Sequence, residues 1–434
     1  MDTVQKLFRF LDESPTCYHA AANAKAALTA AGAVELRESE QWKLEKGTLY
    51  VVERGDSALV AFRVPEGPFH GFLMAAAHSD SPTFKVRETA EAASAGNTLR
   101  LSVEPYGGGV WRGWLDRPLS VAGRVVIRQG DRLVSRLVNI DRDLLVIPGV
   151  AIHMDRSVNK GAELNPAVDL LPLLGCCGKE PGAFRKLIAE AAGVREEHLL
   201  STELFLYPRT KAVQTGLNGE FIVSPRLDDL QCVFGCLEGF LAAKPGGSLP
   251  VLAVFNNEEV GSNTRQGADS TFLTDVLERI AHGCGLDSEA WKAAVANSFM
   301  VSADNAHAIH PAHPEYADKG EFPVLGGGIV IKYNANQRYT TDAVSGAVFQ
   351  AICQEAGVPT QRYSNRADLP GGSTLGNIST AHLSVPTVDI GLPQLAMHSV
   401  CETAGAADTD YLVKAMTAYF SRDFHRDRDG GIVF

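Results

Sequence analysis

The feature that most constrains this chain is an apolar run at residues 251–255 that is soon followed by two adjacent carboxylates, Glu258 and Glu259. A continuous apolar run that ends in a polar turn predicts a strand buried on both faces. Open α/β sheets bind their ligands beyond the carboxyl ends of such strands. Neighbouring carboxylates repel each other, so we expect a positive partner close by, most simply a metal ion. A solvated loop after a strand is the alternative.

The order of apolar segments predicts an α/β fold with a mostly parallel central sheet and helices on both of its faces. Strands are expected at 48–52, 58–64, 71–77, 251–255, 299–302, 329–333 and 387–390, and helices at 1–11, 14–32, 228–243, 270–282, 342–355 and 409–421.

Residues 87–224 have a different character. Short β segments at 99–103, 119–127, 132–138 and 144–147 are separated by glycine-rich turns, with one helical stretch at 182–192. We therefore expect one discontinuous domain, 1–86 plus 225–434, that is interrupted by a β-rich insert at 87–224.

Composition restricts the partners and the compartment. The formal net charge of −11 disfavours nucleic acid or an anionic membrane as a partner, since both require basic patches. No apolar stretch approaches the length of a membrane span, and the amino terminus lacks the features of a signal peptide. The eight cysteines include no Cys-x-x-Cys pair, which indicates reduced, mostly buried thiols. We expect a soluble cytoplasmic protein.

Four further segments place metal-capable side chains at the end of a strand or the start of a helix. They are His78 with Asp80 after 74–77, Asp228 with Asp229 at a helix start, Asp304 after 299–302, and His398 after the strand at 387–390. Each has an ordinary alternative, such as a hydrogen-bonded histidine or aspartates that complement a helix dipole. Because the ends of parallel strands converge, however, we expect one site with nitrogen and oxygen ligands that suits a pair of divalent ions.

Five motifs follow one another along the whole chain. They read His-Ser-Asp-Ser-Pro at 78–82, Arg-Leu-Asp-Asp at 226–229, Asn-Asn-Glu-Glu-Val-Gly-Ser at 256–262, Ser-Ala-Asp-Asn-Ala-His at 302–307 and Gln-Leu-Ala-Met-His-Ser at 394–399. Together they closely resemble the aspartyl aminopeptidase family of dinuclear zinc metallopeptidases. The resemblance implies that His78 and Asp304 hold one ion, that Glu259 and His398 hold the other, and that Asp228 bridges them.

The resemblance also assigns Glu258 as the general base and Asp80 as the residue that orients His78. Chemistry agrees in outline. Two ions with three carboxylate ligands keep enough positive charge to bind a hydroxide, and Glu258 could pass the water's proton to the leaving amine. The order of residues alone does not decide between Glu258 and Glu259 as ligand, or between Asp228 and Asp229 as bridge. The same ligands would accept zinc, cobalt or manganese, and the resemblance favours zinc.

For substrate binding, the resemblance points to Lys332 and Tyr339 as the pocket for an aspartate or glutamate side chain. Without it, Lys332 reads as a lysine that protects the edge of a strand. A glycine-rich turn at 368–374 could also turn backbone amides toward substrate. His153 lies in the insert, and the resemblance implies that it reaches a neighbouring subunit's site and stabilises the tetrahedral intermediate. The insert then resembles an oligomerisation domain of a homo-oligomer, a dodecamer.

The sequence thus indicates a metal-dependent aminopeptidase that removes amino-terminal Asp or Glu from peptides. One alternative is a neutral-residue aminopeptidase with the same dinuclear site, and Lys332 is the discriminating residue. The other is a non-catalytic assembly protein with an inherited metal site. The adjacent pair of Glu258 and Glu259 disfavours that reading, because a purely structural site has no use for a spare base.

Overall fold

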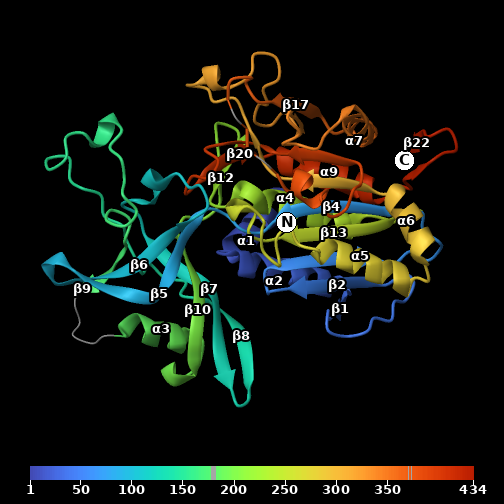
Figure 1. The fold of residues 1–434 in the computed structure, drawn as a ribbon. Coiled ribbons are helices and arrows are strands. Elements are labelled where there is room, and N and C mark those ends of the chain that lie inside the picture. The colour runs from blue at the N-terminus through green and yellow to red at the C-terminus, as the bar shows by residue number, and fades with distance from the viewer. Residues whose placement is uncertain (177–181, 370, 373) are drawn as a thin grey trace.

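The computed structural model describes residues 1–176, 182–369, 371–372 and 374–434. Its largest sheet has nine strands (Figure 1). In spatial order they are β1 (Val34–Leu36), β2 (Leu49–Arg54), β3 (Ala58–Arg63), β13 (Leu249–Phe255), β4 (Phe72–His78), β14 (Phe299–Ala303), β18 (Thr387–Gly391), β16 (Ile329–Tyr333) and β17 (Thr360–Ser364). The central strands β13, β4, β14 and β18 are parallel, while β3 and β16 run antiparallel to their inner neighbours. The predicted α/β fold with its mostly parallel central sheet is confirmed.

Both faces of this sheet are covered because its central strands are apolar on both sides. In β13, Leu252 and Val254 enter one core, and Val251, Ala253 and Phe255 enter the other. The first core is closed by α1 (Thr3–Glu13), α2 (Cys17–Ala30), α4 (Leu227–Ala242), α7 (Ala343–Glu355) and α9 (Asp408–Phe420). The second is closed by α5 (Phe272–Gly283), α6 (Ser288–Ala296) and α8 (Leu375–Ser379). The continuous apolar runs in the sequence reflect this burial on two sides.

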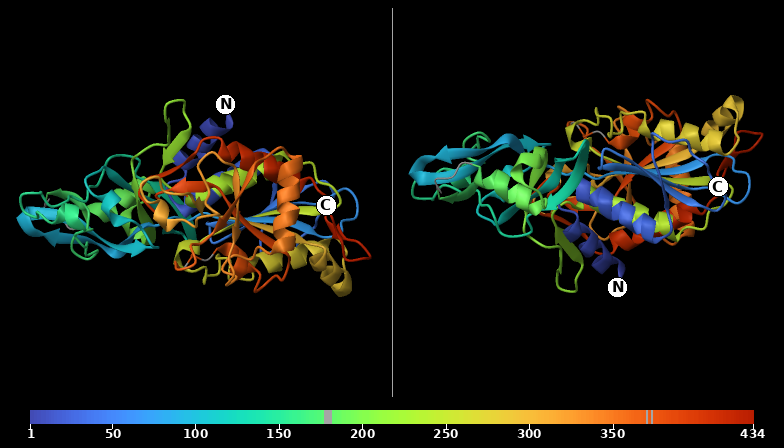
Figure 2. Two further views of the ribbon diagram at one scale, coloured as in Figure 1. Left: turned by 90° about the horizontal axis from the view of Figure 1, so that it is seen from above. Right: turned by 90° about the horizontal axis from the view of Figure 1, so that it is seen from below.

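A second, antiparallel sheet of six strands projects to one side of the α/β body (Figures 1 and 2). Its order is β8 (Arg132–Asn139), β7 (Leu119–Gln129), β10 (Leu199–Pro208), β5 (Thr83–Ser94), β6 (Thr98–Tyr106) and β9 (Leu173–Cys176). It has its own hydrophobic core, which Phe184 and Ile188 of α3 (Ala183–Ala191) complete. The strand expected at 144–147 is wrong. Leu145 and Ile147 are buried, but residues 145–147 form isolated bridges rather than a ladder.

A third sheet of five short strands joins segments that are far apart in sequence. It contains β11 (Val213–Thr215), β12 (Phe221–Ser224), β20 (Glu402–Gly405), β19 (Pro393–Leu395) and β15 (Ala306–His307). Because β12 leads into α4, β15 follows β14, and β19 and β20 flank residues 396–401, this sheet gathers three of the segments in which metal ligands were predicted.

The remaining elements are short. They are the strand pair β21 (His425–Arg426) and β22 (Ile432–Val433), and the 3-10 turns η1 (Ala95–Asn97), η2 (Trp111–Trp114), η3 (Val158–Lys160), η4 (Glu196–His198), η5 (Glu258–Val260) and η6 (Pro314–Tyr316). Among the described residues, no helix combines the length and the apolar character that crossing a bilayer requires.

Candidate metal centre

Two groups of side chains at the carboxyl edge of the central sheet could each hold a metal ion. The first contains His78, Asp228, Asp229 and Asp304, and the second contains Asp228, Glu259 and His398. In each group the candidate ligand atoms lie within 4.8 Å of one another. The parallel direction of β13, β4 and β14 explains the meeting, since these strands end at the same edge. Asp228 belongs to both groups, so its two carboxylate oxygens could contact two ions.

His78 is the last residue of β4, and its two ring nitrogens face different partners. Nε2 lies 3.4 Å from Asp228 Oδ1 and 3.9 Å from Asp304 Oδ1. Nδ1 lies 3.1 Å from the carbonyl oxygen of Asp80 and 3.4 Å from its Oδ1. A histidine whose Nδ1 is held in this way presents Nε2 to a metal ion. Asp80 thus lies on the Nδ1 side of His78, and its orienting role stays a prediction.

His398 forms the more exposed end of the cluster, and its side chain is 31% exposed. Its Nε2 lies 3.3 Å from Glu259 Oε2 and 3.6 Å from Asp228 Oδ2. Its Nδ1 lies 2.9 Å from the carbonyl oxygen of Gly108, which belongs to the β-rich region. That contact fixes Nε2 toward the carboxylates, and it was not expected from the sequence.

Glu258 and Glu259 follow β13 in the turn η5, where they diverge. Asn257 takes a left-handed conformation, with φ of 62°, and the chain turns there. The backbone N–H groups of Glu258 and Glu259 donate to the two carboxylate oxygens of Asp80, at 3.1 and 3.2 Å. Glu259 enters the second ligand group, whereas Glu258 belongs to neither group found among the described residues. Burial and the neighbouring carboxylates, led by Asp304, raise the pKa of Glu258 to about 7.

The cluster has more negative charge than the described side chains neutralise. Asp228 Oδ1, Asp229 Oδ1 and Glu259 Oε1 are buried and have no hydrogen-bond partner in the described part of the chain. Asp229 Oδ2 accepts a bond from the backbone N–H of His78 at 3.2 Å. Buried carboxylate oxygens without partners are costly, and a divalent cation would satisfy them. The residues present therefore fit a metal ion with nitrogen and oxygen ligands, and zinc is such an ion.

A cavity of about 190 Å³ opens beside the cluster, and all of the predicted metal ligands line it together with Glu258, Lys332 and Tyr339. Lys332 is 3% exposed, and its Nζ donates to the carbonyl oxygen of Asn305 at 2.8 Å. The same Nζ lies 3.6 Å from Asp304 Oδ2. Although burial opposes ionisation, Lys332 and His78 lower the pKa of Asp304 to about 2.

Two further expectations concern loops. Gly372 and Thr374 of the glycine-rich turn line the same cavity, whereas Pro370 and Ser373 lie outside the described residues. His153 is exposed in the loop between β8 and β9, and it takes part in neither ligand group within the described part of this chain. Of the predicted site residues, His153 is thus the one that a single chain does not bring to the centre.

Glu402, on β20, is a residue of the site that the sequence analysis missed. It is 2% exposed, and it accepts hydrogen bonds from the backbone N–H groups of Asp228 at 3.0 Å and His398 at 2.8 Å. It therefore ties the bridging candidate to the loop of the most distant ligand. Its sequence context contains no recognisable motif. The one feature of the sequence that could have indicated Glu402 is its position shortly after His398.

A histidine and carboxylate cluster of this kind, at the carboxyl edge of a mixed α/β sheet and beside a cavity with a spare glutamate, defines a metal-dependent hydrolase. The family model described as "Aminopeptidase I zinc metalloprotease (M18)" matches residues 10–420. The chain therefore belongs to the M18 family of zinc metallopeptidases, and it is an aminopeptidase, a metal-dependent exopeptidase.

Relatives of similar length support this assignment. The probable M18 family aminopeptidase 2 of Clostridium acetobutylicum is 43% identical over 97% of this chain and 99% of its own length. The protein of the same name from Pseudomonas aeruginosa strain PAO1 is 41% identical, over 96% and 97%. The resemblance noted in the sequence is confirmed at the level of family and reaction.

Solved structures agree with the fold. A chain in the cryo-EM structure of the Ape4 and Nbr1 complex matches with a TM-score of 0.93 at 35% identity, over 96% of this chain and 85% of that chain. The S. cerevesiae mApe1 dodecamer matches with a TM-score of 0.85 at 26% identity, over 97% of both chains. The whole architecture, with its β-rich region, is thus shared with M18 aminopeptidases.

Proposed function

We propose that this aminopeptidase uses two metal ions to remove amino-terminal Asp or Glu from peptides. The observation that carries this proposal is the pair of ligand groups that share Asp228 beside a cavity with a buried lysine, Lys332. His78 and Asp304 would hold one ion, Glu259 and His398 the other, with Asp228 between them. Zinc is the expected metal, and cobalt or manganese would suit the same donors.

Bound ions of this kind polarise the scissile carbonyl and lower the pKa of a water molecule. Glu258 lies beside them and lines the cavity without belonging to a ligand group. In the reaction, its carboxylate oxygen takes the proton from the attacking water and returns it to the leaving amine nitrogen. Asp80 keeps the Nδ1 side of the His78 ring occupied, so that Nε2 stays directed at the site.

Lys332 and Tyr339 would receive the acidic side chain of the substrate. The Lys332 Nζ lies 5.5 Å from the centre of the Tyr339 ring, and both residues are buried at the cavity wall. A carboxylate would pair with this ammonium group, and a neutral substrate would offer it no partner, which discriminates strongly.

A neutral-residue specificity is the second candidate, because one observation favours it. Lys332 already donates to the carbonyl oxygen of Asn305 and lies 3.6 Å from Asp304. On this reading the Lys332 ammonium group pairs with Asp304 and keeps that carboxylate ionised. It would then not bind the side chain of the substrate.

We also propose that residues 87–224 form an oligomerisation insert within a catalytic domain of residues 1–86 and 225–434. The mApe1 match is a dodecamer, and we extend a homo-oligomeric assembly of that kind to this chain. The loop that carries His153 exposes Val150, Ile152 and Met154, and Met154 is 84% exposed. A neighbouring subunit would cover these side chains and receive His153 at its active site, where the imidazole would stabilise the tetrahedral oxyanion.

A cytoplasmic location is part of the same proposal. The cysteines within the described residues are free, and Cys17, Cys232, Cys236 and Cys353 are buried. Thiols of this kind suit a reducing compartment.

The test is hydrolysis of Asp-, Glu-, Leu- and Lys-chromogenic substrates by the purified protein. Each substrate is measured with the protein as isolated, after chelation, and after zinc, cobalt or manganese is added back. Chelator-sensitive release with Asp or Glu far ahead of Leu supports the proposal. A preference for Leu would keep the metal chemistry and remove the acidic pocket. No cleavage with any metal would refute the catalytic assignment of the site.

A further inference from the structure

We infer that Tyr106, at the end of β6 in the insert, is a positioning residue for the metal ligands and couples the insert to the metal centre. This inference rests on the ligand set proposed above. Tyr106 belongs to the β-rich region and is not among the residues that line the metal cavity, although its hydroxyl reaches the residues just after β4 and β13. Its influence is therefore indirect, through Asp80.

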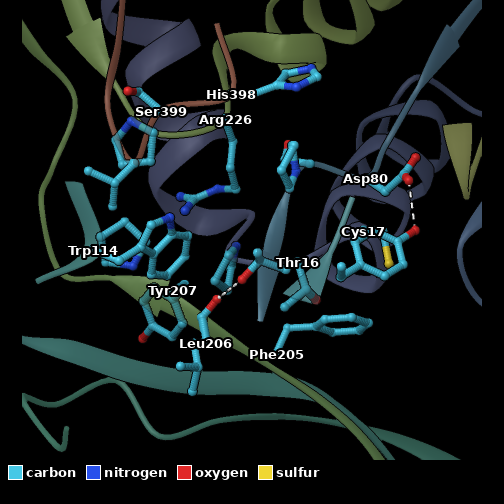
Figure 3. A pocket seen from close by; sticks show the side chains of 18 of the residues that line it. Thr16, Cys17, Asp80, Trp114, Phe205, Leu206, Tyr207, Arg226, His398 and Ser399 are labelled. Carbon is cyan, nitrogen blue, oxygen red and sulfur yellow. Dashed lines mark hydrogen bonds between the residues drawn. The ribbon is translucent and has the colours of Figure 1, made fainter. Parts of the chain in front are cut away.

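The Tyr106 hydroxyl joins the ends of two catalytic strands. It donates to Asp80 Oδ2 at 2.7 Å, and it accepts from Asn257 Nδ2 at 2.8 Å. Asp80 follows β4, and Asn257 follows β13 and directly precedes Glu258. Asp80 lines a pocket between the central sheet and the β-rich region, and Figure 3 labels it there and marks a hydrogen bond of its carboxylate with a dashed line.

Asp80 in turn contacts residues of both proposed ion positions. Its carboxylate accepts from the backbone N–H groups of Glu258 and Glu259, and its Oδ1 lies 3.4 Å from His78 Nδ1. The Tyr106 hydroxyl thus adds a third hydrogen-bond donor to the two backbone N–H groups that bind the Asp80 carboxylate. Groups that hydrogen-bond the orienting carboxylate of a metal-bound histidine are themselves part of how the metal is held.

The residues that follow Tyr106 contact His398, the proposed ligand at the more exposed end of the cluster. The carbonyl oxygen of Gly108 lies 2.9 Å from His398 Nδ1, and the backbone N–H of Val110 donates to the carbonyl oxygen of His398 at 2.9 Å. Gly107 has φ of 72°, and a Cβ there would lie 3.1 Å from Glu259 Cβ. One continuous segment of the insert, 106–110, therefore contacts the surroundings of both proposed ion positions. Movement of the insert would change how tightly the ions are held.

The test compares Tyr106→Phe with the matched control Tyr207→Phe in the full-length protein. Phenylalanine keeps the ring of Tyr106 against Phe205, whose ring centre lies 5.4 Å away, and removes the hydroxyl. Tyr207 lines the same pocket, but its hydroxyl donates to Asn139 Oδ1 at 2.7 Å, inside the insert. Zinc affinity is measured by competition with a chromogenic chelator, and thermal unfolding is measured with and without zinc.

We expect Tyr106→Phe to weaken the binding of at least one zinc ion by about 10- to 100-fold, as for other changes behind a metal ligand. Its zinc-dependent rise in Tm should shrink, while Tyr207→Phe keeps the zinc affinity and the rise of the wild type. A purely structural role would instead lower the Tm equally with and without zinc. That result, or unchanged zinc affinity in Tyr106→Phe, would overturn the inference. Wild-type protein that binds no zinc would refute the proposed ligand set itself.

Discussion

At the scale of single residues, the turn that follows β13 separates the positions of Glu258 and Glu259, and the different roles proposed for them rest on that separation. Both side chains are carboxylates with the same intrinsic chemistry, but only Glu259 joins a ligand group among the described residues. Burial and nearby carboxylates raise the pKa of Glu258 to about 7 in the chain without metal. Bound cations would lower that pKa again and favour the ionised form that a general base needs.

The first prediction concerns this base. Glu258→Gln should keep both ions and lower kcat by about 100- to 10,000-fold, because an amide cannot accept the proton of the attacking water. The measurement is kcat together with the zinc content of the purified variant. Glu289→Gln, on the exposed surface of α6, is the control and should behave as the wild type. Turnover close to the wild type in Glu258→Gln would remove its role as base.

The second prediction concerns Lys332. Lys332→Met keeps an unbranched side chain of similar length and removes the ammonium group. If the lysine recognises acidic substrates, the ratio of kcat/KM for Asp over Leu substrates should fall at least 10-fold with zinc still bound. Zinc content must be measured alongside, because Lys332 also lies 3.6 Å from Asp304. An unchanged ratio with lost zinc would favour the neutral-residue candidate.

The third prediction concerns pH and His19 in α2. Burial and the nearby Arg226 lower the pKa of His19 from 6.5 to about 4. The unfolded chain therefore binds a proton at this residue at a higher pH than the folded chain does. The stability contribution of neutral His19 is fully present above about pH 6.5 and is lost as the pH falls toward 4. The full loss is on the order of 3 kcal/mol, since the shift of His19 from 6.5 to about 4 is about 2.5 pKa units and one unit corresponds to about 1.4 kcal/mol.

Urea unfolding of the metal-free protein at pH 7.5 and pH 5 tests this, with His19→Gln as the comparison. Glutamine cannot take up the proton, so the variant should lose less stability between the two pH values than the wild type. Chelator is present in both samples, so that acid release of metal does not contribute. An identical loss in wild type and variant would show that His19 is not responsible.

At the scale of elements, the loop between β6 and η2 is one part of the β-rich region that contacts the proposed metal ligands. The fourth prediction is that Gly107→Ala lowers both zinc affinity and turnover. A side chain at φ of 72° is strained, and its Cβ would press on Glu259. Gly130→Ala is the matched control, because Gly130 has φ of 63° and no atom within 4 Å of an added Cβ. Both changes should cost about 1 kcal/mol of stability, but only Gly107→Ala should affect zinc. Equal zinc affinities in the two variants would contradict the contact.

The sequence predicted those helices and strands whose own residues show a clear apolar pattern. The run at 251–255 and the run at 74–77 are buried on both sides, so their apolar character is continuous and their polar ends stand out. The long strand β5 was missed because its polar and apolar residues do not alternate cleanly along its whole length. Its extended conformation depends on pairing with β6 and β10, which are distant in sequence or not recognisable as partners from sequence alone. The helix α6 was missed too, although Asp287 caps its N-terminus.

The same distinction applies to the site. The segments that contain His78, Asp228, Glu259, Asp304 and His398 could be singled out because each follows or begins a recognisable strand or helix. The choice of Glu259 over Glu258 and of Asp228 over Asp229 came from the family resemblance and stays a prediction. Glu402 and Gly108 could not be singled out, because they act through single hydrogen bonds to backbone or ring atoms that are distant in sequence. Their positions depend on how the five-stranded sheet and the insert pack against the central sheet.

At the scale of the whole molecule, the fifth prediction is that activity depends on assembly. His153→Ala should keep the oligomer and lower kcat, because the residue is exposed in its own chain and would act in a neighbour. Met154→Glu places a charge on a side chain that is 84% exposed in the single chain, and it should shift the molecular mass toward smaller species. Mass photometry and turnover are measured on the same samples. Full turnover by a monomeric variant would refute the dependence.

The position of β13 has a consequence for how the protein is made. It lies between β3 and β4 in the sheet, yet it is synthesised after the entire β-rich region. A nascent chain that ends before Leu249 therefore holds β3 and β4 without the strand that joins them, while the six-stranded sheet already has all of its strands. The proposed ligands extend to His398, so the proposed metal site is complete only once that residue has been synthesised. The contact between β3 and β4 that β13 provides therefore forms only after the β-rich region has been synthesised.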